Sequence, residues 1–291
     1  MAKLKFTVPD KCNGIRLDTF LRREHDLSGT TIKKAKWRKN GLTMNGEHIR
    51  SIDRVIAGAV IIVDTGDENA EYQNSNIDVE VVFEDDDIVI FNKPAGMCTH
   101  PTKGQQVDTL GNVFAGRKET AGFVYRPVGR LDRDTSGLVL VAKNPHVAWA
   151  LRDSVIKKYY AIVHNVPNPA EGKIDAPIGR EGGTGTRKRC VVSNGSRAVT
   201  NYSVINSNGE YSLVELILET GRTHQIRVHM AYTGCPLIGD ELYGGSTGLI
   251  ARQALHCYSM EIIHPLKKDK IYVESKLPDD MQNALKGILP E

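Results

Sequence analysis

No run of apolar residues in this sequence approaches the roughly 20 needed to cross a bilayer. The first six residues, Met1 to Phe6, include two lysines, and no long apolar stretch leads to a small-residue cleavage site of the secretory kind. These absences predict a cytoplasmic protein that does not enter a membrane.

Cysteine is also scarce. The five cysteines are odd in number and widely scattered, with no CxxC pair and no partnered metal spacing. His224 and His229 lie five residues apart, whereas two ligands on one helical face need a spacing of three or four. We therefore expect reduced, mostly buried thiols, no metal site and no cofactor. The cysteines are Cys12, Cys98, Cys190, Cys235 and Cys257.

Charge is distributed unevenly along the chain. Its 291 residues, 40% of them hydrophobic, suffice for one large domain and a small one, and the net charge is only +3. Residues 1–64 carry thirteen Lys and Arg against seven Asp and Glu, a net +6, while 65–90 carry nine acids and no base, which leaves +6 for 91–291. Two basic units separated by an acidic joint are expected where both units touch a polyanion.

We accordingly divide the chain into a small domain at 1–64, an acidic linker at 65–76 and a large domain at 77–291. In the small domain, Leu17, Phe20 and Leu21 have helical spacing, and a second short helix with a basic face follows. The Asn45–Gly46 pair predicts a hairpin before a final strand. This order resembles the S-four type RNA-binding domain, and the simpler alternative is a solvated cationic helix. The RNA-binding residues expected here are Arg16, Lys33, Lys34, Lys36 and Arg38.

The large domain mixes strands joined by hairpins with strands joined by helices. Such an order predicts an α+β fold on a mixed, mainly antiparallel sheet with flanking helices, without the strict alternation of a doubly wound fold. Strands are predicted at 77–83, 88–91, 138–142, 159–163, 202–205, 213–218 and 271–273, and helices at 146–156, 224–232 and 279–285.

The segment from Arg126 to Ala142 carries the clearest chemical signal. Two aspartates precede a Thr-Ser-Gly turn that feeds an apolar strand, so Asp132 is predicted to lie in a loop fixed by the core. Beside Arg130 and Arg133, a carboxylate there can stay ionised while partly desolvated, and can act as nucleophile or base. From spacing alone, a structural turn with surface ion pairs is the better interpretation.

Residues 129–137, GRLDRDTSG, resemble the signature of the RluA-type pseudouridine synthases. Five further blocks resemble that family in the same order along residues 90–265, and an S-four type domain often precedes them. Gly129 stands where many members carry histidine. The other blocks are NKPAG with HP at 92–101, KKYYA at 157–161, GRTHQIRVH at 221–229, PLIGDELYG at 236–244, and RQALH with HP at 252–265.

The resemblance implies an isomerase that converts uridines of structured RNA, ribosomal or transfer, to pseudouridine. It implies that Asp132 is catalytic, that Tyr159 stacks on the base, and that Arg222 pairs with Asp132. Arg130, Ile226 and His224 would bind substrate. On pattern alone, Tyr159 could equally be a core aromatic and Arg222 could pin a loop. We expect a monomer with no obligatory protein partner.

Two other functions are consistent with parts of the sequence. An RNA-binding or assembly factor that had lost the chemistry would show a replaced Asp132 or Tyr159, and both are present. A hydrolase using Asp132 and His224 as base and acid would be expected to carry a nucleophile elbow or a metal-ligand cluster, and the sequence has neither. Whether Asp132 attacks the anomeric carbon or removes the neighbouring sugar proton stays open.

Overall fold

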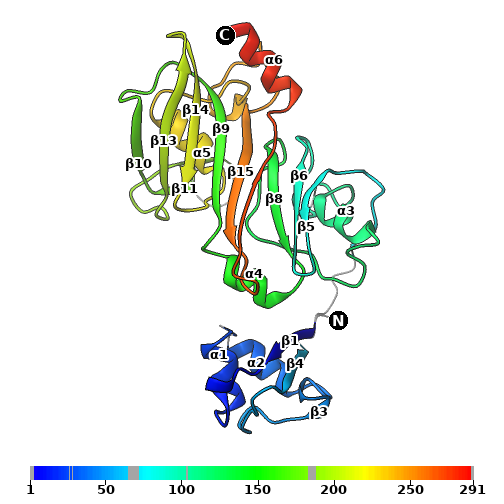
Figure 1. Ribbon diagram of the computed structural model, residues 1–291. Helices are drawn as coiled ribbons and strands as arrows, with labels where there is room; N and C mark the ends of the chain where they lie inside the picture. Colours follow the sequence, from blue (N-terminus) through cyan, green and yellow to red (C-terminus); the bar gives the residue numbers. More distant parts are fainter. Residues whose placement is uncertain are drawn as a thin grey trace.

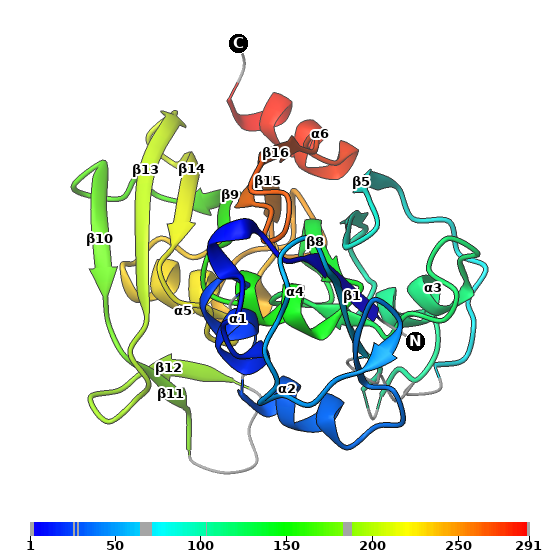
Figure 2. The same ribbon diagram turned by 60° about the horizontal axis from the view of Figure 1, so that its bottom comes forward.

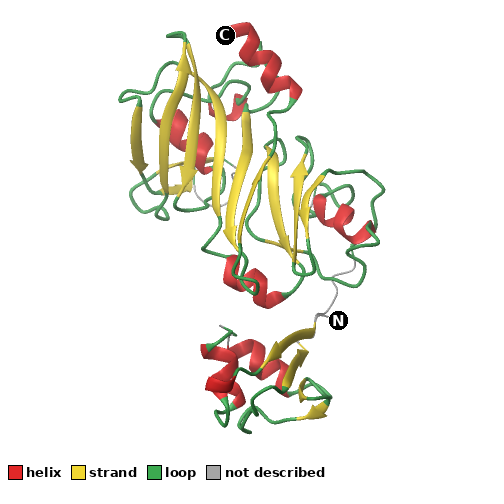
Figure 3. Cartoon of the chain, viewed as in Figure 1, coloured by secondary structure: helices red, strands yellow, loops and turns green. Residues whose placement is uncertain are grey.

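The computed structural model describes residues 3–25, 27, 29–64, 72–102, 104–182 and 188–289. The chain forms a small N-terminal domain and a large domain built on one long sheet (Figures 1 and 3). Within the described residues, no helix has both the length and the apolar character that a membrane crossing requires.

The N-terminal domain packs two helices on a four-stranded antiparallel sheet of order β1-β4-β2-β3. The predicted hairpin is confirmed: Asn45 and Gly46 both have positive φ, which a tight turn of this kind requires. The core takes Phe20 and Leu21 from the first helix and Ile32 and Ala35 from the second. The elements are β1 (Lys3–Thr7), α1 (Leu17–Arg23), α2 (Gly29–Lys36), β2 (Leu42–Met44), β3 (Glu47–His48) and β4 (Val60–Asp64), with a 3-10 turn at Asp10–Cys12.

The large domain is a ten-stranded sheet whose main path runs β10-β13-β14-β9-β15-β8-β6-β5. Neighbouring strands among the described residues pair antiparallel except β8 and β15, which are parallel at the centre. The strands are β5 (Val81–Glu84), β6 (Ile88–Lys93), β7 (Arg126–Pro127), β8 (Ser136–Ala142), β9 (Ile156–His164), β10 (Glu171–Asp175), β13 (Val199–Ser207), β14 (Tyr211–Leu218), β15 (Leu255–Ile263) and β16 (Lys270–Glu274), beside a separate pair, β11 (Ile178–Arg180) and β12 (Arg189–Val191).

Helices lie around this sheet (Figures 1 and 2). In the order of the chain they are α3 (Leu110–Gly116), α4 (Pro145–Leu151), α5 (Gln225–Tyr232) and α6 (Asp279–Ile288), with a 3-10 turn at Glu241–Tyr243. Helix α5 packs against β12 and β13 beside the middle of the sheet, while α6 covers a separate apolar cluster at one end. The predicted α+β class is confirmed.

Three differences between the predicted and the observed elements concern the sheet. The helix expected at 146–156 ends at Leu151, because Ile156 already begins β9. The strand expected from Ile77 begins only at Val81. Strand β15 was missed, although it lies at the centre of the sheet and is almost wholly buried. A strand buried on both faces lacks the alternation by which strands are recognised.

Part of the segment predicted as an acidic linker packs on the large domain. Residues 65–71 lie outside the described residues, but 72–76 pack on the large domain. The Tyr72 ring meets Tyr125 at 5.7 Å, and Asn112 Nδ2 donates to the Gln73 carbonyl at 2.7 Å. These residues therefore belong to the large domain rather than to the linker.

The parallel β8–β15 contact is unusually close. Gly137 has φ +112°, and a Cβ there would lie 2.2 Å from the Cys257 carbonyl oxygen, so only glycine fits. Beside it, buried His256 lies between two serines, with Nδ1 2.9 Å from Ser136 Oγ and Nε2 2.9 Å from Ser275 Oγ. Burial lowers the pKa of His256 to about 4.

His256 should make the fold sensitive to acid. The pKa of His256 is about 4 when folded and near 6.5 when unfolded, so only the unfolded chain gains the proton between those values. The free energy of unfolding should therefore fall as pH drops from 6.5 to 4, by about 3 kcal/mol from this residue. Urea unfolding at several pH values measures it. His256→Gln should flatten that slope; an unchanged slope would assign the acid sensitivity elsewhere.

Candidate active site

A cleft opens above the centre of the sheet, where the loop before β8, strand β9, the end of β14, helix α5 and the start of β15 converge. Five segments far apart in sequence thus contribute to one site. The cleft is lined by Arg130, Leu131, Asp132, Thr135, Tyr159, Leu218, Arg222, His224, Gln225, Ile226, Arg227 and Leu255. All six site residues predicted in the large domain are among them.

The loop carrying Asp132 is fixed from below by polar contacts. Fully buried Lys93 donates to the carbonyl of Arg133 at 3.0 Å and to two carbonyls of its own turn, which occupies all three ammonium protons. Thr99 Oγ1 donates to the Leu131 carbonyl at 2.9 Å. Arg252 Nη1 reaches the Asp134 carbonyl at 3.1 Å. The backbone on both sides of Asp132 is therefore held in place.

One buried guanidinium joins the two acids of the site. Arg227 grips Asp240 with two hydrogen bonds of 2.6 and 2.8 Å, and its third nitrogen, Nη1, donates to Asp132 Oδ2 at 3.2 Å. Burial alone would lower the pKa of Arg227, but Asp240 and Asp132 together raise it. Because the fork is fixed by Asp240, its remaining donor points at Asp132, whose side chain is 19% exposed.

Arg222 does not make the predicted contact with Asp132. It lies exposed at the rim of the cleft, where its Nε donates to the Arg197 carbonyl at 2.9 Å. The partner of Asp132 is Arg227, five residues further along the same block and the third residue of α5. Arg222 precedes the helix, and its backbone amide donates to the side chain of Gln225.

His224 reaches Asp132 from the start of α5. Its Nε2 lies 3.8 Å from Asp132 Oδ2, and its Nδ1 lies 2.9 Å from the Tyr243 hydroxyl. The residue adopts a left-handed backbone with φ +58°, an uncommon conformation for a side chain other than glycine. Burial lowers the pKa of His224, although Asp132 opposes the shift, so the ring is neutral at pH 7.

The other wall of the cleft is apolar. Tyr159 is buried on β9, with Ile226 of α5 opposite and Leu218 and Leu255 completing the wall. Burial raises the pKa of Tyr159 well above 10, so its hydroxyl stays neutral. The adjacent Tyr160 points to the opposite face of the sheet and stacks on Tyr258 at 3.9 Å, as strand alternation requires.

Gly129 has a local explanation. Its φ is +81°, and a Cβ there would lie 3.0 Å from Nζ of Lys157. Lys157 occupies this space because its ammonium donates to the Val128 carbonyl at 2.9 Å. A histidine at position 129 would require both a strained backbone and a displaced Lys157. Next to it, Arg130 lies exposed over the cleft.

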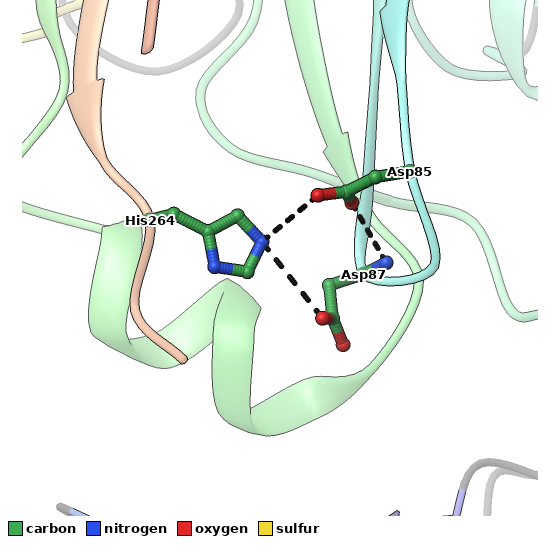
Figure 4. A group of neighbouring side chains, drawn as sticks. All are labelled: Asp85, Asp87 and His264. Atoms are coloured by element: carbon green, nitrogen blue, oxygen red, sulfur yellow. Dashed lines mark hydrogen bonds and ion pairs between the residues drawn. The ribbon is translucent and has the colours of Figure 1, made fainter. Parts of the chain in front are cut away.

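A second polar cluster lies outside the cleft, where Asp85, Asp87 and His264 meet (Figure 4). His264 Nε2 is 3.2 Å from Asp85 Oδ2 and 3.8 Å from Asp87 Oδ2. Its Nδ1 accepts from the amides of Leu266 and Lys267, so the ring proton is assigned to Nε2, between the acids. A protonated nitrogen cannot ligate a metal. The cluster is therefore best described as a polar contact that joins the β5–β6 and β15–β16 turns.

The RNA-binding residues predicted in the N-terminal domain are exposed to different degrees. Lys33, Lys34 and Lys36 are exposed along α2. Arg38 is half-buried just beyond the helix. Arg16 makes a two-bonded ion pair with Asp18, at 2.8 and 3.1 Å.

Sequence reasoning missed Arg227, Asp240 and Tyr243. Arg227 lies within the GRTHQIRVH block, and a buried arginine inside an apolar helix is itself a signal because such a charge needs a carboxylate partner. Asp240 lies in the next block and is equally buried. The sequence does not show that these two blocks lie together, because only the fold brings them into contact.

The chain is similar to known proteins over most of its length. Residues 87–232, half of the chain, match the family described as RNA pseudouridylate synthase. A Pseudomonas aeruginosa protein, ribosomal large subunit pseudouridine synthase D, is 38% identical over 94% of this chain and 92% of its own. The uncharacterized RNA pseudouridine synthase YhcT of Bacillus subtilis is 44% identical over 71% of each chain.

A solved structure gives the same result for the fold. Human RNA pseudouridylate synthase domain containing 4 superimposes with a TM-score of 0.55 at 26% identity, covering 70% of this chain and 91% of its own. Together with the sequence relatives, these matches show that the chain belongs to the RNA pseudouridylate synthase family.

Proposed function

We propose that this enzyme isomerises uridines of ribosomal RNA to pseudouridine, with Asp132 as the reacting carboxylate. One observation carries the proposal: Asp132 stands between a polar wall, formed by the Arg227 guanidinium and the His224 ring, and an apolar wall built on Tyr159. The ribosomal target rests on relatives named as large-subunit synthases. Mapping pseudouridines in RNA from cells with and without the gene tests that target.

The reaction breaks the bond between ribose and N1 of uracil, turns the base and rejoins it through C5, so no atoms are gained or lost. Asp132 serves either as nucleophile at the anomeric carbon or as base toward the neighbouring sugar proton, and both routes need the ionised form. The Arg227 hydrogen bond fixes the direction of the Asp132 side chain.

The apolar wall suits a base that has left its stack. A detached uracil has to be held while it turns, and Tyr159, Ile226 and Leu255 offer flat or apolar contact without competing hydrogen bonds. Above them, exposed Arg130 can contact phosphate or fill the gap left in the RNA. We also propose that the N-terminal domain is of the S-four type and that it binds RNA through its cationic helix α2.

The first test removes the charge of Asp132. Asp132→Asn keeps the size of the side chain but can act neither as nucleophile nor as base, so turnover should fall at least about a thousandfold. RNA affinity should stay within a few fold. Nucleoside analysis of the RNA after incubation measures the product. Turnover close to that of the unmodified enzyme would refute the assignment.

The second test separates Arg227 from Arg222. Arg227→Lys keeps a charge but cannot grip Asp240 and reach Asp132 at once, so kcat should fall roughly ten- to a hundredfold. Arg222→Ala should change kcat by less than a few fold, since its side chain points to Arg197. Thermal unfolding of each variant controls for the fold. An equal loss in Arg222→Ala would mean that RNA binding brings Arg222 to Asp132.

The third test concerns binding by the N-terminal domain. Replacing Lys33, Lys34 and Lys36 together by Gln removes up to three phosphate contacts, so the slope of log affinity against log salt should flatten by about 2 to 3. KM should rise more than kcat falls. The matched control, Lys276→Gln with Lys286→Gln, removes exposed charges next to and within α6. If both variants behave alike, α2 is not an RNA anchor.

A further inference from the structure

Within the part of the chain that the structure describes, Trp37 is the most exposed large apolar residue. It directly follows α2, and its ring is 77% exposed, whereas Ile32 and Ala35 of the same segment are buried in the core. A single exposed apolar residue is ordinary on a protein surface. Two neighbouring features make Trp37 informative.

The first feature is a cavity of about 150 Å³ in the same domain. This volume is several times what one water molecule needs. Leu42 and Ile49 are its buried apolar residues, and polar groups from His48, Arg50 and Ser51 surround them. Ile52, 51% exposed, also lines it. A cavity lined by apolar residues and a few polar groups is typical of sites that bind small molecules.

The second feature is Lys36, which connects the ring with the cavity. Its ammonium lies 5.5 Å from the centroid of the Trp37 ring, and its side chain also lines the cavity. Lys33 and Lys34 lie exposed on the same helix. The surface therefore combines cations, an open aromatic face and a cavity within one short stretch of chain.

We infer that the N-terminal domain captures an unpaired nucleotide of the RNA, with the base against Trp37 or in the adjacent cavity and the phosphates on α2. Stacking on an aromatic side chain requires an exposed base face, which a paired A-form helix does not offer. The lysines alone would accept any phosphate backbone; the ring and cavity add selection for a loop or bulge. The inference rests on the proposed RNA binding of this domain and specifies its ligand.

The experiment uses the full chain, which has two tryptophans. Trp149→Phe in α4 leaves Trp37 as the single indole. The probes are an RNA duplex and the same duplex interrupted by an unpaired loop. Stacking should quench Trp37 fluorescence with the looped RNA and not with the duplex. Trp37→Ala should weaken looped-RNA binding roughly ten- to a hundredfold, Trp37→Phe should retain most of it, and duplex binding should not change.

A matched pair of charge variants tests the cavity. Ile52→Glu and Ile56→Glu each place one acid at an exposed isoleucine of this domain, but only Ile52 is among the residues lining the cavity. The long-range electrostatic repulsion of RNA should be similar in the two variants. A larger loss of looped-RNA affinity in Ile52→Glu would therefore show that the cavity takes part in binding. Equal losses would remove the cavity from the proposal.

The outcomes separate this inference from the function beneath it. If the lysine variant loses affinity but Trp37→Ala binds looped RNA normally, the domain holds RNA by phosphates alone and the nucleotide site is refuted. If neither variant changes affinity, RNA binding by the domain itself is refuted. Quenching by duplex and looped RNA alike would also contradict the selection for unpaired bases.

Discussion

The site depends on one buried cation held by two acids. Arg227 has a low-exposure position in α5 that would be costly for an isolated charge, and Asp240 offsets that cost with two short hydrogen bonds. The same pair leaves one guanidinium nitrogen, Nη1, to donate to Asp132. Because Asp240 fixes the fork, the direction of that donor is set before any RNA arrives, which is what a preorganised electrostatic site requires. Replacing either member would disturb both stability and orientation.

Asp132 is held by its backbone as firmly as by its charge. Lys93, Thr99 and Arg252 come from three different segments, and each bonds a carbonyl of the loop rather than a side chain. Side chains in the loop are thus left to face the cleft. The sequence blocks that resemble the family therefore contain two kinds of residue. Some hold the backbone of the loop, and others line the cleft. The order of the blocks in the sequence does not show which residues are of which kind.

Local patterns predicted the fold class, most strands and the position of Asp132, since alternation and turn residues report burial directly. They failed at β15, which is buried on both faces. The resemblance pointed to Arg222 as the partner of Asp132, whereas in the structure Arg227 donates to that carboxylate. Arg222 precedes α5, and Arg227 lies in its first turn. Which of them faces Asp132 depends on where α5 begins, and Gln225 sets that point through bonds to β13.

In the N-terminal domain, the sequence predicted the helix but not the orientation of a residue next to it. Its basic helix was evident from the sequence, but the sequence does not show which way the Trp37 ring points. In the structure the helix ends at Lys36, and Trp37 turns outward beside the cavity. One residue past a helix end, the helical period no longer determines which way a side chain points. An apolar residue in a helix is expected to pack in the core, whereas the exposed Trp37 is available for binding. Only the folded domain shows which of the two applies.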